Sequence, residues 1–313
     1  MKNNLNMTMR DTLLQNIYHS MKKNKKIFFV TADFGAPLLD QIRRNYKDRF
    51  INVGVAEANL INVCSGLASE GFDVFAFAIA PFITMRCYEQ IRINLALLST
   101  NKKINVNLIG VGAGVSYDIS GPTHHCLEDL SIMTQLPNFD IFSPSDSFLV
   151  DKFFKCTIQD KNPKYLRFDS KFLKNLDFIK SDWKFDDGFR VLNSGEGTCI
   201  IGTGFGSHLA KQFQIKTSLN VGIVDFYFLK KFNKKKFNKL IKKYNKIITI
   251  EESFKDYGTL ENILRIEIMK TKNHISLQTF GFKNEYTFKI GDRNFIHSLH
   301  NMSAKDLLRE IKI

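Results

Sequence analysis

A glutamate, Glu57, stands where a short apolar strand gives way to an apolar helix. The strand covers residues 49–53, Gly54 allows a sharp turn, and Glu57 then falls in the first turn of a helix over residues 56–67. A carboxylate at this position is favoured by the helix macrodipole. Taken alone, the stretch therefore favours a structural role for Glu57.

Two adjacent histidines, His124 and His125, follow a Gly-Pro-Thr sequence on a predicted loop. The loop begins with a glycine-rich run over residues 110–114, where glycine allows the backbone to approach a ligand closely or simply makes the loop mobile. Adjacent histidines can ligate metal, but no cysteine or carboxylate stands at the spacing of a zinc site. Because ligands gather at this edge of an α/β sheet, substrate contact is favoured over metal binding.

A second glycine-rich segment, Gly202-Thr203-Gly204-Phe205-Gly206, lies between a predicted strand and a predicted helix. It is similar to a nucleotide-binding turn, but the sixth position is Ser207, so the glycine fingerprint is incomplete. A tight strand-to-helix turn is the favoured interpretation.

The elements that would position these residues alternate between strand and helix. In the first part of the chain, strands are predicted over residues 27–31, 49–53, 73–77, 104–109, 140–143 and 164–168, with helices over 8–21, 56–67, 81–98 and 146–159. This order predicts an α/β fold with a parallel sheet covered by helices on both faces.

A polar, turn-rich stretch over residues 177–197 separates this part from a second α/β part. There, strands are predicted over 198–201, 221–225, 246–250 and 275–279, with helices from Ser207, Asn233 and Gly258 and a final helix over 303–311. The predicted domains are therefore residues 1–187 and 188–313, each with a mostly parallel sheet and helices on both faces.

Composition limits the class of protein. The chain has 313 residues, a formal charge of +14, and 44% hydrophobic residues, which is typical of a globular protein of about two domains. The five cysteines are scattered without CxxC spacing, which indicates reduced thiols in the cytoplasm. No apolar run suits a membrane span or a signal peptide. Lysine clusters fall on predicted helix ends and solvent faces, so they favour a solvated surface over nucleic-acid binding.

Several motifs resemble the transketolase family when they are taken in order. They are Asp33-Phe34-Gly35, the run from Arg49 to Glu57, Phe82 with Arg86-Cys87-Tyr88-Glu89-Gln90-Ile91-Arg92, Gly121-Pro122-Thr123-His124, Leu136-Pro137-Asn138 and Ser143-Pro144-Ser145-Asp146. The resemblance covers about residues 8–312 and is strongest to the C-terminal half of split, two-subunit transketolases. It implies a pyrimidine-binding domain followed by the transketolase C-terminal domain.

The resemblance also implies roles for particular residues. The family glutamate matching Glu57 hydrogen-bonds N1′ of the thiamine diphosphate aminopyrimidine, and an aromatic ring at Phe82 stacks on that heterocycle. Ile79 replaces a neighbouring family phenylalanine, and Asp33 matches an acidic position near the pyrimidine edge. His124 matches a histidine that faces the substrate, so Glu57 and His124 are the predicted catalytic residues. The predicted substrate contacts are His124, His125, Ser120, Arg86, Gly112, Ser170 and Lys171.

Three positions depart from the family pattern. Gly112 replaces a histidine that contacts the sugar, Ser120 replaces an aspartate that reads a substrate hydroxyl, and Ser170, beside Lys171, replaces an arginine that grips the sugar phosphate. Serine cannot imitate the two-pronged guanidinium. These changes predict a modified or nucleotide-linked sugar rather than a simple sugar phosphate.

The family motif that binds Mg²⁺ and the diphosphate is missing, because no Gly-Asp-Gly occurs in the sequence. The resemblance therefore implies that the metal ligands lie on a partner, the N-terminal transketolase subunit, in a heterotetramer of two chain types. The expected reaction is transfer of a two-carbon ketol unit from a ketose to an aldehyde, with activity only in the presence of that partner.

Two alternatives remain open from the sequence. One is the β subunit of a 2-oxo acid dehydrogenase-type complex, which would need a lipoyl carrier partner. The other is a non-catalytic regulatory module with the same fold. The Val-Gly-Val-Ala-Glu and Gly-Pro-Thr-His runs favour the transketolase over both.

Overall fold

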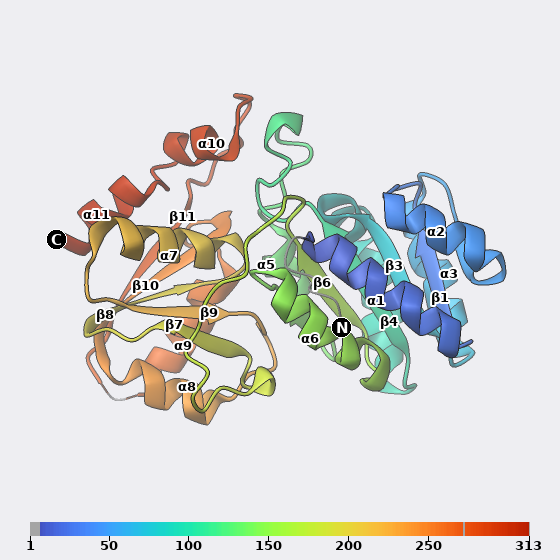
Figure 1. Ribbon diagram of the computed structural model, residues 1–313, viewed down its shortest axis with the longest axis horizontal. Helices are drawn as coiled ribbons and strands as arrows, with labels where there is room; N and C mark the ends of the chain where they lie inside the picture. The colour runs from blue at the N-terminus through green and yellow to red at the C-terminus, as the bar shows by residue number, and fades with distance from the viewer. Residues whose placement is uncertain (1–6, 272, 313) are drawn as a thin grey trace. The chain divides into compact units, whose positions relative to one another are not determined.

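The computed structural model describes residues 7–271 and 273–312, and Figure 1 shows its ribbon. The chain forms two compact units. The first unit contains the chain up to Ala113 together with Ile132–Phe142 and Asp146–Lys174, and the second contains Gly114–Ser131, Ser143–Ser145 and the chain from Asn175 onward. The predicted domain boundary near residue 188 stays a prediction.

The first unit is built on a sheet whose paired strands are all parallel. Its strand order is β2-β1-β3-β4-β6-β5, with β1 (Ile27–Thr31), β2 (Phe50–Asn52), β3 (Asp73–Ile79), β4 (Asn105–Val111), β5 (Asp140–Phe142) and β6 (Lys164–Phe168). Every residue of β4 and β6 is buried, as expected for central strands covered on both faces.

Helices of the first unit form two groups. In one, α1 (Met9–Lys23) packs against α2 (Pro37–Asn45) and α6 (Ser147–Gln159), and Figure 1 shows these three on the near side of the sheet. In the other, α3 (Glu57–Ser69) packs on β1, β3 and β4 and on the helical segment that follows β3. This arrangement confirms the predicted fold class for the first unit.

The helical segment after β3 differs from the single predicted helix over residues 81–98. Wide π-helical turns at Phe82–Arg86 and Arg92–Leu97 flank α4 (Tyr88–Ile91), and a 3₁₀ turn follows at Leu98–Thr100. Periodicity alone cannot show such turns, because the buried positions still recur at helical spacing. Wide turns inside helices are frequent at functional sites.

The second unit contains a five-stranded sheet of order β11-β10-β8-β9-β7. Its strands are β7 (Phe189–Asn193), β8 (Gly197–Gly202), β9 (Gly222–Phe226), β10 (Tyr244–Phe254) and β11 (Ser276–Phe282). Only β7 is antiparallel, through its pairing with β9. It lies within the stretch over residues 177–197 that the sequence indicates as turn-rich.

Helices cover both faces of the second sheet as well. Figure 1 shows α7 (Phe205–Thr217) and α11 (Ala304–Lys312) on one side and α8 (Lys234–Ile241) and α9 (Thr259–Met269) on the other. The remaining helices are α5 (Asp129–Met133) and α10 (Arg293–Leu299), with short 3₁₀ turns at Lys47–Arg49, Asp118–Ser120 and Phe185–Asp187. The fold class predicted for the second half is therefore confirmed.

The glycine-rich segment between β8 and α7 is a tight turn. A β-carbon at Gly202 would overlap the backbone of Gly206, and one at Gly206 would lie 2.2 Å from the carbonyl oxygen of Ile250. Both glycines are thus required by close packing of the helix on the sheet, which supports the strand-to-helix turn over a nucleotide site. Across the described part of the chain, no helix combines the length and apolarity needed to span a membrane.

Candidate functional site

The carboxyl edge of the first sheet brings together many of the predicted site residues. Asp33 follows β1, Ile79 ends β3, Gly112 follows β4, and Ser170 and Lys171 follow β6. The chain moves from β1 outward to β2 and then crosses back to β3, so the strand order reverses between β1 and β3. Ligands of α/β proteins bind at such a switch point, at the carboxyl ends of the strands.

Glu57 is the first residue of α3 and is only 6% exposed. Gly54, in the preceding turn, has φ of 76°, a left-handed conformation that a side chain would strain. The carboxylate accepts a hydrogen bond from Arg86, with 3.1 Å between Glu57 Oε1 and Arg86 Nη1. The helix dipole explains why a carboxylate is favoured at the start of α3. It does not explain why this carboxylate is buried at the switch point against a half-exposed arginine, because burial of a charge is costly.

Phe82 also contacts Arg86, the residue that bonds Glu57. The centre of the Arg86 guanidinium lies 3.8 Å from the centroid of the Phe82 ring. A flat nitrogen donor thus lies over the Phe82 ring and bonds Glu57 at the same time. Burial raises the pKa of the neighbouring Cys87 thiol to about 12, and the charge of Glu57 adds to this shift. Cys87 is therefore a neutral packing residue and no nucleophile.

Asn52 is a residue of this edge that the sequence reasoning missed. Its side-chain oxygen accepts hydrogen bonds from the backbone N–H of Asp33 at 2.9 Å and of Gly54 at 3.0 Å. Its amide also donates to Asp33 Oδ1 at 3.0 Å. Asn52 therefore ties the end of β1 to the turn that leads into Glu57. The available signal was an asparagine at a strand end, two residues before a glycine.

Gly112 and the Ser170-Lys171 pair lie at the ends of neighbouring strands. The Gly112 N–H donates to the carbonyl of Phe168 at 2.9 Å, and Gly112 has φ of 105°. Ser170 is half-buried and Lys171 is exposed. The structure therefore brings together two of the three positions that depart from the family pattern.

The third departing position, Ser120, lies on a loop of the second unit with His124 and His125. His124 is half-buried, and its Nδ1 lies 3.0 Å from Thr123 Oγ1. His125 is buried, and its Nε2 finds no hydrogen-bond partner within the described residues. Burial lowers the pKa of His125, against the opposite effects of the Asp118 carbonyl and the carboxylates of Glu252 and Asp118.

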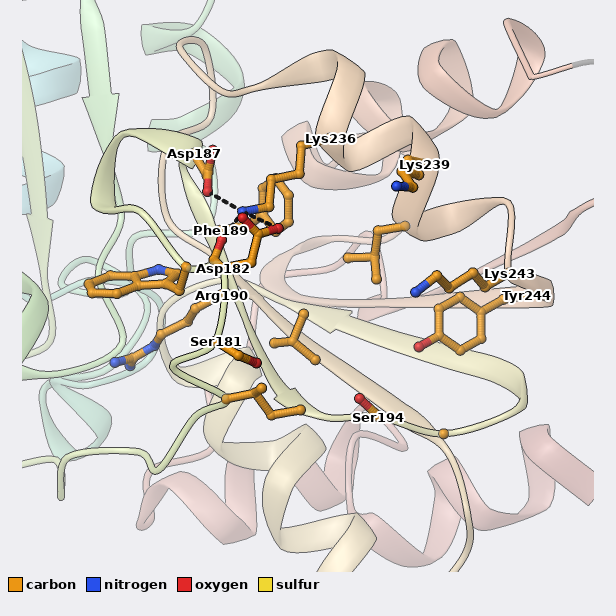
Figure 2. A pocket seen from close by; sticks show the side chains of 15 residues that line it. Ser181, Asp182, Asp187, Phe189, Arg190, Ser194, Lys236, Lys239, Lys243 and Tyr244 are labelled. Atoms are coloured by element: carbon orange, nitrogen blue, oxygen red, sulfur yellow. Dashed lines mark hydrogen bonds and ion pairs between the residues drawn. The ribbon is translucent and has the colours of Figure 1, made fainter.

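The second unit also contains a cavity of about 340 Å³ beside β7 and α8. Figure 2 shows Lys236 reaching toward Asp187 and Asp182, with ion-pair distances of 2.7 Å and 3.2 Å. Lys239 of α8 and Lys243, just after this helix, also line the cavity. None of its described lining residues is a candidate site residue, so this cavity is not the candidate site.

Comparison with known proteins places this geometry in a family. Residues 6–174 match the family model described as transketolase, pyrimidine binding domain. The chain is 27% identical to a subunit of the apulose-4-phosphate transketolase of Phocaeicola vulgatus, over 88% of this chain and 86% of that protein. It is 23% identical to the 6-deoxy-6-sulfo-D-fructose transketolase subunit SqwH of a Clostridium species, over 96% of this chain and 92% of that protein.

Solved structures show the same fold. A chain described as a split gene transketolase, inactive β4 tetramer, superposes with a TM-score of 0.81 at 22% identity, covering 98% of this chain and 97% of that chain. A transketolase from Campylobacter jejuni superposes with a TM-score of 0.79 at 17% identity, but only 46% of that longer chain is covered.

The fold and the family match thus define a two-unit α/β chain with a pyrimidine-binding domain. The chain belongs to the transketolase family and corresponds to its C-terminal half, as found in split, two-subunit transketolases.

Proposed function

We propose that this chain is the subunit of a thiamine-diphosphate-dependent transketolase that provides the activating glutamate, Glu57. The reaction would transfer a two-carbon ketol unit from a ketose donor to an aldehyde acceptor. The observation that carries the proposal is the Glu57–Arg86–Phe82 arrangement at the switch point of the first sheet.

The residues present fit an aminopyrimidine. Arg86 shows that a planar nitrogen donor can lie against Phe82 and bond Glu57 simultaneously, which are the two contacts that the ring would make. Glu57 would share a proton with the ring nitrogen N1′, Phe82 and Ile79 would provide apolar surface, and Asp33 would lie near the ring edge. Thiamine diphosphate supplies carbanion and electron-sink chemistry when it is bound. His124 would orient the substrate and move protons at its carbonyl and hydroxyl groups, and His125 would contact the substrate.

The partner would be an N-terminal subunit that carries the Mg²⁺ and diphosphate ligands. Support comes from the missing Gly-Asp-Gly motif and from relatives that are themselves named transketolase subunits. The active form would be a heterotetramer of two chain types. No part in nucleic-acid or membrane binding is proposed, and the cytoplasm is the proposed location.

The proposed substrate is a modified sugar. Two similar proteins are named for apulose-4-phosphate and 6-deoxy-6-sulfo-D-fructose, and this chain carries Gly112 and Ser170 where a conventional sugar-phosphate grip is expected. Lys171, which is exposed beside Ser170, offers a point charge for an anionic group, without the rigid fork of arginine.

A substrate panel on the reconstituted complex tests this specificity. We expect modified, nucleotide-linked or sulfonated keto sugars to exceed xylulose 5-phosphate with ribose 5-phosphate in kcat/KM by about tenfold or more, because one lost bidentate contact corresponds to about 1.4 kcal/mol or more. If the pentose phosphates gave kcat/KM of about 10⁴ M⁻¹s⁻¹ or above and no other sugar matched them, the chain would be half of a conventional transketolase.

Arg86 lies over one face of Phe82, so a cofactor ring that stacks on this face would displace it. Replacing Arg86 by alanine is therefore expected to tighten binding of thiamine diphosphate to the reconstituted complex by about threefold to tenfold, since a half-exposed ion pair and a cation–π contact contribute about 0.5–1.5 kcal/mol. Calorimetry measures the Kd. Arg92→Ala is the control, because Arg92 pairs with exposed Glu89 instead. Unchanged or weaker binding by Arg86→Ala would show that Arg86 does not compete with the cofactor.

A further inference from the structure

The loop that carries His124 leaves the first sheet and packs into the core of the second unit. Residues 114–131 belong to that unit. Val115 and Leu127, on either side of the histidines, are buried in a hydrophobic cluster with Ile200 and Ile250 of strands β8 and β10. The position of the histidines is therefore set by contacts with the second unit.

Glu252, near the end of β10, makes the polar part of this contact. Its side chain is 2% exposed. Oε1 lies 2.6 Å from His297 Nε2, and Oε2 accepts from Arg293 Nη2 at 3.0 Å. The backbone N–H of Val115 also donates to Oε2, at 3.4 Å. A buried carboxylate held by α10 thus binds the first residues of the loop.

Gly114 allows this approach. It has φ of 58°, and a β-carbon there would overlap the side chain of Glu252. Only glycine fits this left-handed position against the carboxylate. Gly114 is thus required by packing against a side chain of the same chain, whereas an approach of this run to a ligand stays a prediction.

Two further contacts close the loop around the histidines. Gly114 and Cys126 form an antiparallel bridge with hydrogen bonds of 3.1 Å and 2.8 Å. Asp118 Oδ2 accepts from the backbone N–H of Arg293 at 2.9 Å. His124 lies between these attachments, two residues before the bridge, and its own N–H donates to the carbonyl of Gly121 at 3.0 Å.

We infer that Glu252 is a positioning residue: together with Arg293 and His297 it fixes Gly114 and Val115, and so sets the place of His124 from the second unit. Glu252 touches neither cofactor nor substrate in this role. The inference rests on the proposed function only where it assumes that His124 acts on the substrate. The attachment itself is a property of the chain and is testable without any ligand.

Amide hydrogen exchange on the full chain tests the attachment directly. In the wild type, the Val115 amide should be protected like core amides of β10, because its N–H is buried and bonded. Glu252→Gln keeps the size and removes the charge that Arg293 and His297 bind, so exchange over residues 114–126 should rise by about tenfold or more. A Val115 amide that exchanges in the folded wild type at the rate of an exposed loop would overturn the inference, whether or not the variant folds.

Glu251→Gln is the matched control. Glu251 is a buried neighbour on the same strand, but its carboxylate accepts from the N–H groups of Thr259 and Leu260 at the start of α9. This variant should raise exchange at the start of α9 and leave residues 114–126 within about twofold of wild type. Equal effects of both variants on the loop would mean general loosening and would contradict the inference.

Kinetics of the reconstituted enzyme connect the attachment to the reaction. Glu252→Gln should lower kcat by about tenfold and lose most of that effect in a His124→Ala background, because the two changes would act through one group. Additive losses would overturn the positioning role. If the wild-type complex transferred no ketol unit, the proposed function would fail while the exchange result would still decide the attachment.

Discussion

Replacing Glu57 by glutamine is expected to lower ketol transfer by the reconstituted enzyme about a hundredfold or more. Glutamine keeps the shape of the side chain but cannot share a proton with N1′, and acid–base contributions are of this size. Assembly with the partner subunit should survive, because the change adds no volume to a residue at the start of α3. Steady-state kcat and size-exclusion chromatography measure the two properties.

Glu89→Gln is the matched control for this prediction. Glu89 belongs to the helical segment that carries Arg86, but its exposed carboxylate binds Arg92. Its loss should change kcat by less than about twofold, which is well under 1 kcal/mol of barrier. If Glu57→Gln were as active as this control, Glu57 would have no part in activating the cofactor.

The second large effect is dependence on the partner subunit. Purified alone, this chain should turn over no ketose and should not bind thiamine diphosphate tightly, because its sequence lacks the Gly-Asp-Gly motif for Mg²⁺ and the diphosphate. Adding the partner should restore both properties.

Calorimetry on the isolated chain provides the measurement. A Kd of about 1 μM, or about −8 kcal/mol, would be too tight for the aminopyrimidine contacts of Glu57 and Phe82 alone. Such binding without the partner would contradict the proposed division of the cofactor site. Measurements with Mg²⁺ present and absent distinguish a metal-bound diphosphate from weak binding of the ring.

Much of the fold could be predicted because buried parallel strands form continuous apolar runs. Residues 27–31 form such a run and were predicted with the bounds that β1 has. Residues 164–168 were also predicted with the bounds of β6, although Lys164 and Arg167 interrupt their apolar side chains. The antiparallel edge strand β7 was missed because Phe189–Asn193 has only five residues, includes the polar Arg190 and Asn193, and lies inside a turn-rich stretch. Arg190 is nevertheless fully buried, since its guanidinium pairs with Asp225 at 2.8 Å. Long-range ion pairs of this kind leave no local signal in the sequence.

Motif resemblance proposes which residues form the candidate site, and these assignments stay predictions, whereas the contacts among the residues could not be predicted. Nothing in the spacing of Glu57, Phe82 and Arg86 indicates that the guanidinium lies between the other two side chains. The hydrogen bond from Val115 to Glu252 joins residues 137 positions apart, so it depends on the tertiary fold alone. Substrate roles for Ser120, Ser170 and the two histidines stay predictions.

Exchange of the C2 proton of thiamine diphosphate, followed by NMR in deuterated water on the reconstituted complex, tests the central claim most directly. It needs no substrate, so it is independent of which sugar the enzyme uses. We predict that Glu57→Gln slows this exchange about a hundredfold or more with the cofactor still bound, while Glu89→Gln leaves it within about twofold of wild type. Exchange at the wild-type rate in cofactor-saturated Glu57→Gln would contradict the account.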